Sequence, residues 1–171
     1  CKTFNIDIVA IQEHRWQTNE ETTTLSSNGY QFIYSIATER FGILISNKIA
    51  KNILQVKSIS NRILVVTINC NPKITIVCTY APTEEASTAN KDTFYNNLND
   101  CIREVPLHNF VVLIDLNARI GPSNAHVKTI GRHPYHKETN DNGSRLIELC
   151  EANNMCIATT RKPHPDRRKW S

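Results

Sequence analysis

The stretch VVLIDLNARIG, Val111–Gly121, places four apolar residues directly before an aspartate, with an asparagine two positions further on. A short apolar run rich in β-branched residues is typical of a strand that is buried on both faces. Side chains at i and i+2 of a strand point to the same face, so we expect Asp115 and Asn117 to project together at the strand's end. A carboxylate and an amide in this position are costly to desolvate without partners. Either they tie a loop down, or they hold a polar ligand.

Further strand-like runs lie on both sides of this stretch, and clusters of Gly, Pro, Asn or Ser separate most of them. The predicted strands are Ile6–Ile11, Tyr30–Ser35, Phe41–Ser46, Ile53–Ser58, Arg62–Ile68, Ile74–Tyr80, Phe110–Leu116 and Met155–Ala158. Apolar residues at three- and four-residue spacing predict two helices, over Asp92–Val105 and Ser144–Asn153. Many strands with few helices between them favour an α+β or layered α/β fold.

The composition limits the class of protein. At 171 residues and 40% hydrophobic content, the chain suits a single domain over residues 1–171, and no window has the apolar length of a membrane span. The net charge of +4 is compatible with a phosphate-rich partner but does not require one. Because the chain begins with Cys and shows no signal segment, we expect a nuclear or cytoplasmic piece of a longer protein rather than a secreted one.

The cysteines form no CxxC pair. Cys70, Cys78, Cys101 and Cys150 lie within apolar segments, where a free cysteine behaves as a small buried hydrophobe. Without a secretory signal, reduced thiols are favoured over disulfides, so no disulfide-linked partner is expected.

Three predicted strands end in an unusual polar side chain. Glu13, in IVAIQEHRW, is either a ligand for a hard divalent cation or part of a solvated strand end, paired with Arg15 or a lysine. Tyr80, in CTYAPT, either reaches a ligand above the sheet edge or is packed with its hydroxyl in solvent. At the third strand end, Asp115 could act as a base or an orienting group, and Asn117 could donate to a phosphate oxygen.

Two later segments are also polar. Asn142, in the turn TNDNGSRL, is either a functional residue or the cap of the helix that follows, and its Asn-Gly-Ser sequon is interpreted as an accident. A basic tail either contacts phosphate through sequence-independent attraction or forms a solvated hairpin. Its residues are Arg161, Lys162, Arg167, Arg168 and Lys169.

Taken in order, these pieces resemble the endonuclease/exonuclease/phosphatase superfamily. The most specific of them are Ile11-Gln12-Glu13, Tyr80-Ala81-Pro82-Thr83, Asp115-Leu116-Asn117-Ala118 and Asn140-Asp141-Asn142-Gly143. The sequence is most similar to the apurinic-type endonuclease domain of non-LTR retrotransposons and to the craniofacial-development-protein-like sequences related to it. The resemblance runs from Ile6 to about Trp170.

This resemblance implies a four-layer α/β sandwich of the DNase I-like type, in which two mostly antiparallel sheets lie face to face. It also implies cleavage of a DNA phosphodiester with Mg²⁺ as cofactor, Mn²⁺ being the alternative ion. Glu13 would hold the metal, Tyr80 would hydrogen-bond the scissile phosphate, and Asp115 would position or deprotonate the attacking water. Asn117 would orient Asp115 and contact the phosphate, while Asn142 and the basic tail would bind substrate. A reverse transcriptase domain would follow in the same polyprotein.

Two parts of the family pattern are absent from the sequence, namely a first strand with an active-site Asn and a late strand with an Asp-His pair. Losing one electrostatic or acid–base group commonly reduces a rate by ~10²–10⁴. We therefore expect a domain that is truncated at both termini and has little activity by itself. A non-catalytic remnant that serves as a binding or scaffold module is the alternative. A third hypothesis keeps the superfamily but changes the substrate to a phospholipid, an inositol phosphate or a nucleotide.

Overall fold

The structure is a computed structural model that describes residues 5–14, 22–35, 41–105 and 110–163. The chain divides into two compact units. The first comprises Cys1–Ala81 and Asp100–Asp115, and the second comprises Pro82–Asn99 and Leu116–Ser171. The expectation of one domain over residues 1–171 stays a prediction.

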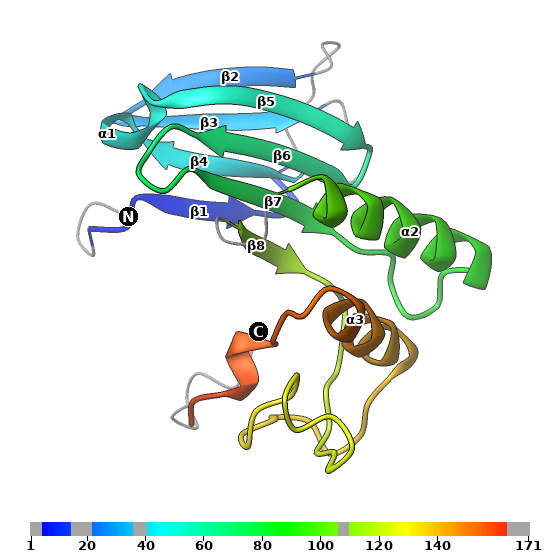
Figure 1. Cartoon of the computed structure of the whole chain (residues 1–171). Coiled ribbons are helices and arrows are strands. Elements are labelled where there is room, and N and C mark those ends of the chain that lie inside the picture. The colour runs from blue at the N-terminus through cyan, green and yellow to red at the C-terminus, as the bar shows by residue number, and fades with distance from the viewer. Residues whose placement is uncertain (1–4, 15–21, 36–40, 106–109, 164–171) are drawn as a thin grey trace. The chain divides into compact units, whose positions relative to one another are not determined.

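The first unit contains two four-stranded sheets, seen in the upper part of Figure 1. One sheet has the order β1-β4-β3-β2 and is antiparallel throughout, with strands Ile8–Ile11 (β1), Thr22–Ser27 (β2), Tyr30–Ser35 (β3) and Gly42–Ser46 (β4). The short helix α1, Asn47–Ala50, leads into the second sheet. That sheet has the order β5-β6-β7-β8, with strands Ile53–Ser60 (β5), Ile63–Ile68 (β6), Ile74–Tyr80 (β7) and Phe110–Asp115 (β8). Only its β7–β8 pair is parallel.

Apolar side chains from both sheets form one buried cluster, so the sheets pack face to face. The members from the two sheets and their connections include Ile33, Phe41, Ile43, Ile45, Leu64, Val66, Ile68, Ile76 and Cys78. Burial of such side chains is the main favourable contribution to folding. Within the first sheet, β3 and β4 lie so close at Gly42 that an added Cβ would be 2.6 Å from the Ile33 carbonyl oxygen. The expected mixed α+β fold with two mostly antiparallel sheets is confirmed at this level.

The second unit is organised around two helices. Helix α2, Thr88–Glu104, begins in this unit, and helix α3 covers Asp141–Ala152. Two hydrogen bonds join them within the unit: the Tyr95 hydroxyl donates to the Asn142 carbonyl at 2.9 Å, and Asn153 Nδ2 donates to Asn99 Oδ1 at 2.9 Å. A 3₁₀ turn, Ala158–Thr160, follows α3. No helix among the described residues has the length and apolar content needed to cross a membrane.

Two predicted elements were wrong. Met155–Ala158 is not a strand, because it contributes only one parallel bridge, between Ile157 and Ile130, before the 3₁₀ turn. Cys70 is exposed rather than buried, because it lies in the turn after β6, whereas Cys78, Cys101 and Cys150 are buried as expected. All five described cysteines are free thiols.

Candidate functional site

Three of the predicted site residues lie together at one end of the first unit. Tyr80 and Asp115 are register partners at the ends of the parallel strands β7 and β8, and the Ala81 amide donates to the Asp115 carbonyl at 2.9 Å. Because both strands run in the same direction, their carboxyl ends reach the same edge of the sheet. The pairing of two apolar strands therefore places a phenol beside a carboxylate.

Glu13 joins this cluster from the other sheet. It follows β1 by two residues, and β1 contacts β8. The Tyr80 hydroxyl donates to Glu13 Oε1 at 3.2 Å, although the two residues are 67 positions apart. Glu13 has φ of 55°, which is uncommon for a glutamate. Residues held in sparsely populated backbone regions cluster at functional sites, so this conformation is a second indication of a role for Glu13.

Arg62 also belongs to this cluster and was not among the predicted site residues. Its guanidinium Nη1 donates to the Tyr80 carbonyl at 3.2 Å, and its own carbonyl accepts the Tyr80 amide at 3.1 Å. The signal that could have identified it is strand register, because Arg62 directly precedes β6, the antiparallel partner of β7. A permanently charged guanidinium thus lies beside the tyrosine that contacts Glu13.

The donor groups of this cluster restrict which metal could bind. Among the described residues, no group of three or more His, Cys, Asp or Glu side chains could hold a metal ion. The described residues therefore do not support a metal site built entirely from protein side chains, such as a structural zinc site. Mg²⁺ needs only one or two carboxylates, since water and phosphate oxygens complete its shell. The exposed carboxylates of Glu13 and Asp115 fit that requirement.

Asn117 lies in the second unit, where two side-chain amides hold its backbone carbonyl. Its φ is 47°, a left-handed conformation that asparagine tolerates well. The Asn117 carbonyl accepts from Asn140 Nδ2 at 3.1 Å and from Asn142 Nδ2 at 3.5 Å. Asn142 Nδ2 also donates to the Pro82 carbonyl at 2.9 Å, and Asn142 is 0% exposed. Two side-chain amides therefore fix the loop that carries Asn117.

The N-terminus of α3 is capped by Asn140 rather than by Asn142. Asn140 Oδ1 accepts from the amides of Gly143 and Arg119, both at 2.8 Å. Its Nδ2 donates to Glu84 Oε2 at 2.7 Å, while Glu84 Oε1 accepts from the Asp141 amide at 3.1 Å. A carboxylate at the start of a helix is stabilised by the helix dipole. Asn142 and Gly143 accordingly lie inside the first turn of α3, which begins three residues earlier than predicted.

Ion pairs surround this helix terminus. Lys91 is only 4% exposed; its Nζ donates to the Glu84 carbonyl at 2.6 Å and lies 3.1 Å from Asp141 Oδ2. Arg145 contacts Asp141 at 3.0 Å and Asp92 at 2.5 Å. Hydrogen bonds from Arg145 and then Lys91 hold the pKa of the Asp141 carboxyl below its usual value. The buried lysine has its partners in place, as a buried charge requires.

The predicted site is thus found in two parts, with Glu13, Tyr80 and Asp115 in the first unit and Asn117 and Asn142 in the second. The burial of Asn142 gives it a positioning role, whereas its direct contact with substrate stays a prediction. A glycan at this sequon is also incompatible with a fully buried amide.

Only part of the predicted basic tail is described. Arg161 and Lys162 are exposed, and the Arg161 guanidinium donates to the Lys128 carbonyl. Arg167, Arg168 and Lys169 lie outside the described residues.

Two curated proteins are similar to almost the entire chain. Craniofacial development protein 2 of Bos taurus is 27% identical over 174 residues, which cover 98% of this chain and 28% of the relative. Craniofacial development protein 2 of Tragulus javanicus is 26% identical over 174 residues, which cover 98% of this chain and 29% of the relative. The chain therefore spans less than a third of the length of these relatives. No family model and no solved structure matches it. The expected similarity to craniofacial-development-protein-like sequences is confirmed.

Proposed function

We propose that the chain carries part of the catalytic site of a magnesium-dependent DNA endonuclease, a phosphodiester hydrolase of the kind found in non-LTR retrotransposons. The contact between the Tyr80 hydroxyl and Glu13 Oε1 at 3.2 Å supports this most directly, since Asp115 is the register partner of Tyr80. The two sheets packed face to face support membership of the endonuclease/exonuclease/phosphatase superfamily and a DNase I-like sandwich. A reverse transcriptase domain further along the same polyprotein belongs to this proposal.

In this proposal each residue has a separate task. Glu13 would hold Mg²⁺, or Mn²⁺, and the bound ion would neutralise charge that develops on the phosphate. A phenol has one proton to donate. The Tyr80 hydroxyl therefore donates to Glu13 when no substrate is bound, and would donate to a phosphate oxygen when DNA is bound. In this step water would attack phosphorus and pass a proton to Asp115, while one P–O ester bond breaks and the departing oxygen takes a proton from solvent.

Two further residues support that chemistry. Arg62 adds a fixed positive charge beside Tyr80, where negative charge accumulates in the transition state. The resemblance gives Asn117 the task of orienting Asp115 and donating to the phosphate, and the backbone of its loop is held by Asn140 and Asn142.

The test is single-turnover nicking of supercoiled plasmid by the complete product, which is the protein encoded by the longest open reading frame that contains this chain. We expect magnesium-dependent nicking that falls by ~10²–10⁴ in Asp115→Asn and in Glu13→Gln, because each substitution removes a carboxylate without changing side-chain size. Affinity for uncleaved DNA should stay within about twofold, because phosphate contacts elsewhere supply most of it.

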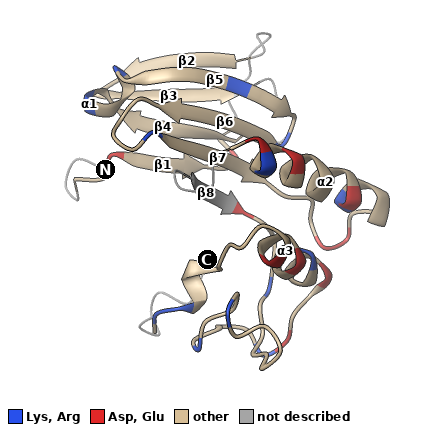
Figure 2. Cartoon of the chain, viewed as in Figure 1, with Lys and Arg blue, Asp and Glu red and all other residues tan. Residues whose placement is uncertain are grey.

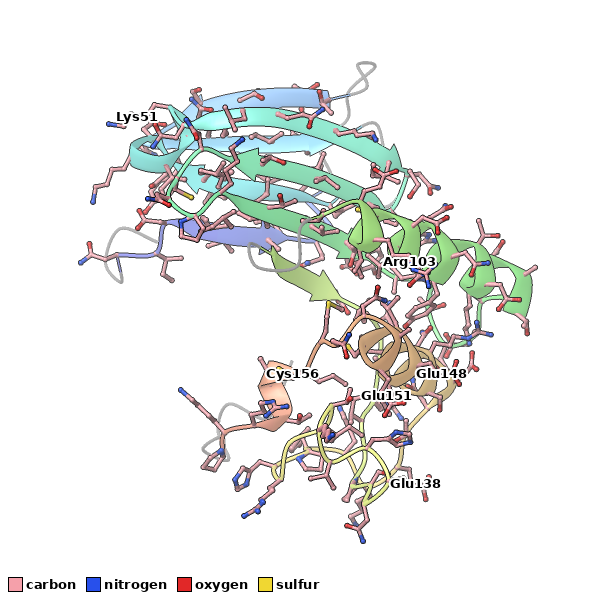
Figure 3. All side chains as sticks on the ribbon, in the orientation of Figure 1. Lys51, Arg103, Glu138, Glu148, Glu151 and Cys156 are labelled. Atoms are coloured by element: carbon pink, nitrogen blue, oxygen red, sulfur yellow. The ribbon has the colours of Figure 1, made fainter. Side chains whose placement is uncertain are left out.

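Asp100→Asn on α2 and Glu148→Gln on α3 are matched controls, since both carboxylates are exposed; Glu148 is labelled in Figure 3. The controls should nick at the unmodified rate. If the complete product does not nick with Mg²⁺ or Mn²⁺, or if Asp115→Asn leaves the rate intact, the proposed reaction is wrong.

A second candidate function is a non-catalytic nucleic-acid-binding or scaffold module. It is favoured by two segments of the second unit, residues 116–137 and 152–162, which contain six lysines and arginines and no Asp or Glu. DNA binding without any nicking by the complete product would select this candidate.

A further inference from the structure

The second unit separates its charges along the chain. Between Leu116 and Lys137 there is no Asp or Glu, and between Ala152 and Lys162 there is none either. These segments carry the basic residues Arg119, Lys128, Arg132, Lys137, Arg161 and Lys162. Figure 2 shows blue on the loops that follow β8, whereas α2 and α3 carry red as well as blue. Segregation of this kind creates a positive potential on one surface even when the net charge is small.

Backbone hydrogen bonds join the two basic segments into one surface. The Ile157 amide donates to the Thr129 carbonyl at 2.9 Å, and the His133 amide donates to the Thr160 carbonyl at 2.9 Å. Gly131 approaches so closely that an added Cβ would lie 2.2 Å from the Thr160 carbonyl oxygen. The cations on these segments are therefore held on a packed scaffold.

We define the basic platform as the four exposed cations that these contacts bring together. They are Lys128, Arg132, Arg161 and Lys162. Arg161 also ties the two segments to each other, since its guanidinium donates to the Lys128 carbonyl. Among the described residues, none of the four forms an ion pair with a carboxylate. Their charge is not neutralised within the described part of the unit.

An exposed tyrosine, with a half-buried histidine beside it, follows Lys128 and Arg132 along the chain. Tyr135 is 47% exposed, and its ring lies 5.0 Å from the ring of His136 at an interplanar angle of 64°. Large exposed aromatic rings next to cations are suited to stacking on unpaired bases, since every base has an aromatic face. Tyr135 comes three residues after Arg132, which is close enough for one strand to use both.

We propose that the basic platform and Tyr135 form a nucleic-acid-binding surface, with backbone phosphates on the four cations and an unpaired base on the tyrosine. This surface extends the predicted contribution of Arg161 and Lys162 to a second segment of the chain. The choice of DNA as the probe rests on the proposed function, but binding here needs neither Mg²⁺ nor Glu13, Tyr80 and Asp115.

The experiment measures fluorescence anisotropy of a labelled 20-nucleotide single strand and of its duplex, titrated with the 171-residue chain in EDTA at several salt concentrations. We expect Lys128→Gln combined with Arg132→Gln to weaken binding of both probes by roughly 10-fold at low salt. The slope of log K against log salt should fall by about one for each cation removed. Tyr135→Ala should weaken single-strand binding by roughly fivefold or more and leave duplex binding nearly unchanged.

The charge-matched control combines Lys48→Gln with Lys51→Gln, two exposed lysines at α1 in the first unit; Lys51 is labelled in Figure 3. An equal loss in this control, or no binding by the unmodified chain, would overturn the proposal. The proposal would also be overturned if the chain bound phosphatidylserine vesicles through the basic platform but did not bind the oligonucleotides. Platform-dependent binding without nicking by the complete product would contradict only the proposed function.

Discussion

Glu13 and Asn117 both have left-handed backbones, yet the two units hold them in opposite ways. In the first unit, Glu13 is exposed and its side chain accepts a hydrogen bond from Tyr80. In the second unit, the Asn117 carbonyl accepts hydrogen bonds from the side chains of Asn140 and of the fully buried Asn142. The first unit places Tyr80 and Asp115 through strand register, so we expect substitutions of these two side chains to affect folding little. The second unit places its polar groups through a side-chain network, so changes there should affect folding before function.

The largest expected effect tests the buried half of this comparison. Asn142→Asp puts a carboxylate where Asn142 Nδ2 now donates to the Pro82 and Asn117 carbonyls. We expect a loss of about 3–5 kcal/mol in the free energy of unfolding at neutral pH, because an unpaired buried charge is costly. Chemical denaturation measures it.

The same substitution should also make stability depend on pH. Burial raises the pKa of the new carboxyl above the value of about 3.9 in the unfolded chain, so the folded state prefers the protonated form. The loss of unfolding free energy caused by the carboxylate should be small below pH 4 and should grow as the pH rises towards the folded-state pKa. Asn96→Asp, at an exposed position of α2, is the control and should lose little. A similar loss in both variants would show that the buried network is not what holds the second unit.

An effect of opposite sign is expected in the first unit. Glu13→Gly should stabilise the protein by about 1 kcal/mol, because glycine adopts a φ of 55° without the steric cost paid by glutamate. The functional cost should appear in Mn²⁺ binding, measured as paramagnetic broadening of the Tyr80 and Asp115 amide signals in NMR spectra. Broadening should be present in the unmodified chain and absent in the variant. If Glu13→Gly destabilised the protein, or left the broadening unchanged, the hypothesis that Glu13 is a metal ligand with a strained backbone would be wrong.

The smallest effect concerns Asp141, whose pKa is lowered by Arg145 and Lys91. A carboxyl with a lowered folded-state pKa adds stability above its unfolded value, about 3.9, and this contribution is lost as the pH falls through the folded value. Because the side chain is 47% exposed, solvent screening reduces the contribution to roughly 0.5 kcal/mol. Asp141→Asn should therefore flatten the stability curve below about pH 4, relative to Asp100→Asn on α2. Parallel acid titrations of the two variants, followed by circular dichroism, would check this difference.

The same contrast explains which parts of the fold were predictable. Tyr30–Ser35 and Ile74–Tyr80 are strands with the predicted bounds, because apolar runs between turn residues leave few alternatives. Thr22–Ser27 was not predicted, since its sequence TTTLSS has a single apolar residue and the strand depends on pairing with β3. Met155–Ala158 has apolar residues but no neighbouring strand to extend its one bridge.

The candidate site was predictable to a similar extent. The strand-end residues Glu13, Tyr80 and Asp115 were identified because apolar runs end directly before polar side chains. Arg62 was not, because a basic residue at the start of a strand carries no local signal, and its contact with Tyr80 follows only from the register of β6 and β7. The network around Asn140 was not predicted either. Both asparagines of the Asn-Asp-Asn stretch precede the same helix, and only the three-dimensional contacts show which of them caps it.

The parallel pairing of β7 with β8 also has a consequence for how the chain folds during synthesis. β7 ends at Tyr80, and its partner does not begin until Phe110. While the intervening segment is being translated, the hydrogen-bonding edge of β7 has no strand to pair with, and such edges promote association between chains. The second sheet is completed only after Asp115 has left the ribosome, which raises the contact order of the first unit and should slow its folding. Any shorter version made for expression should therefore retain residues 110–115, even if the segment between the two strands is replaced by a linker.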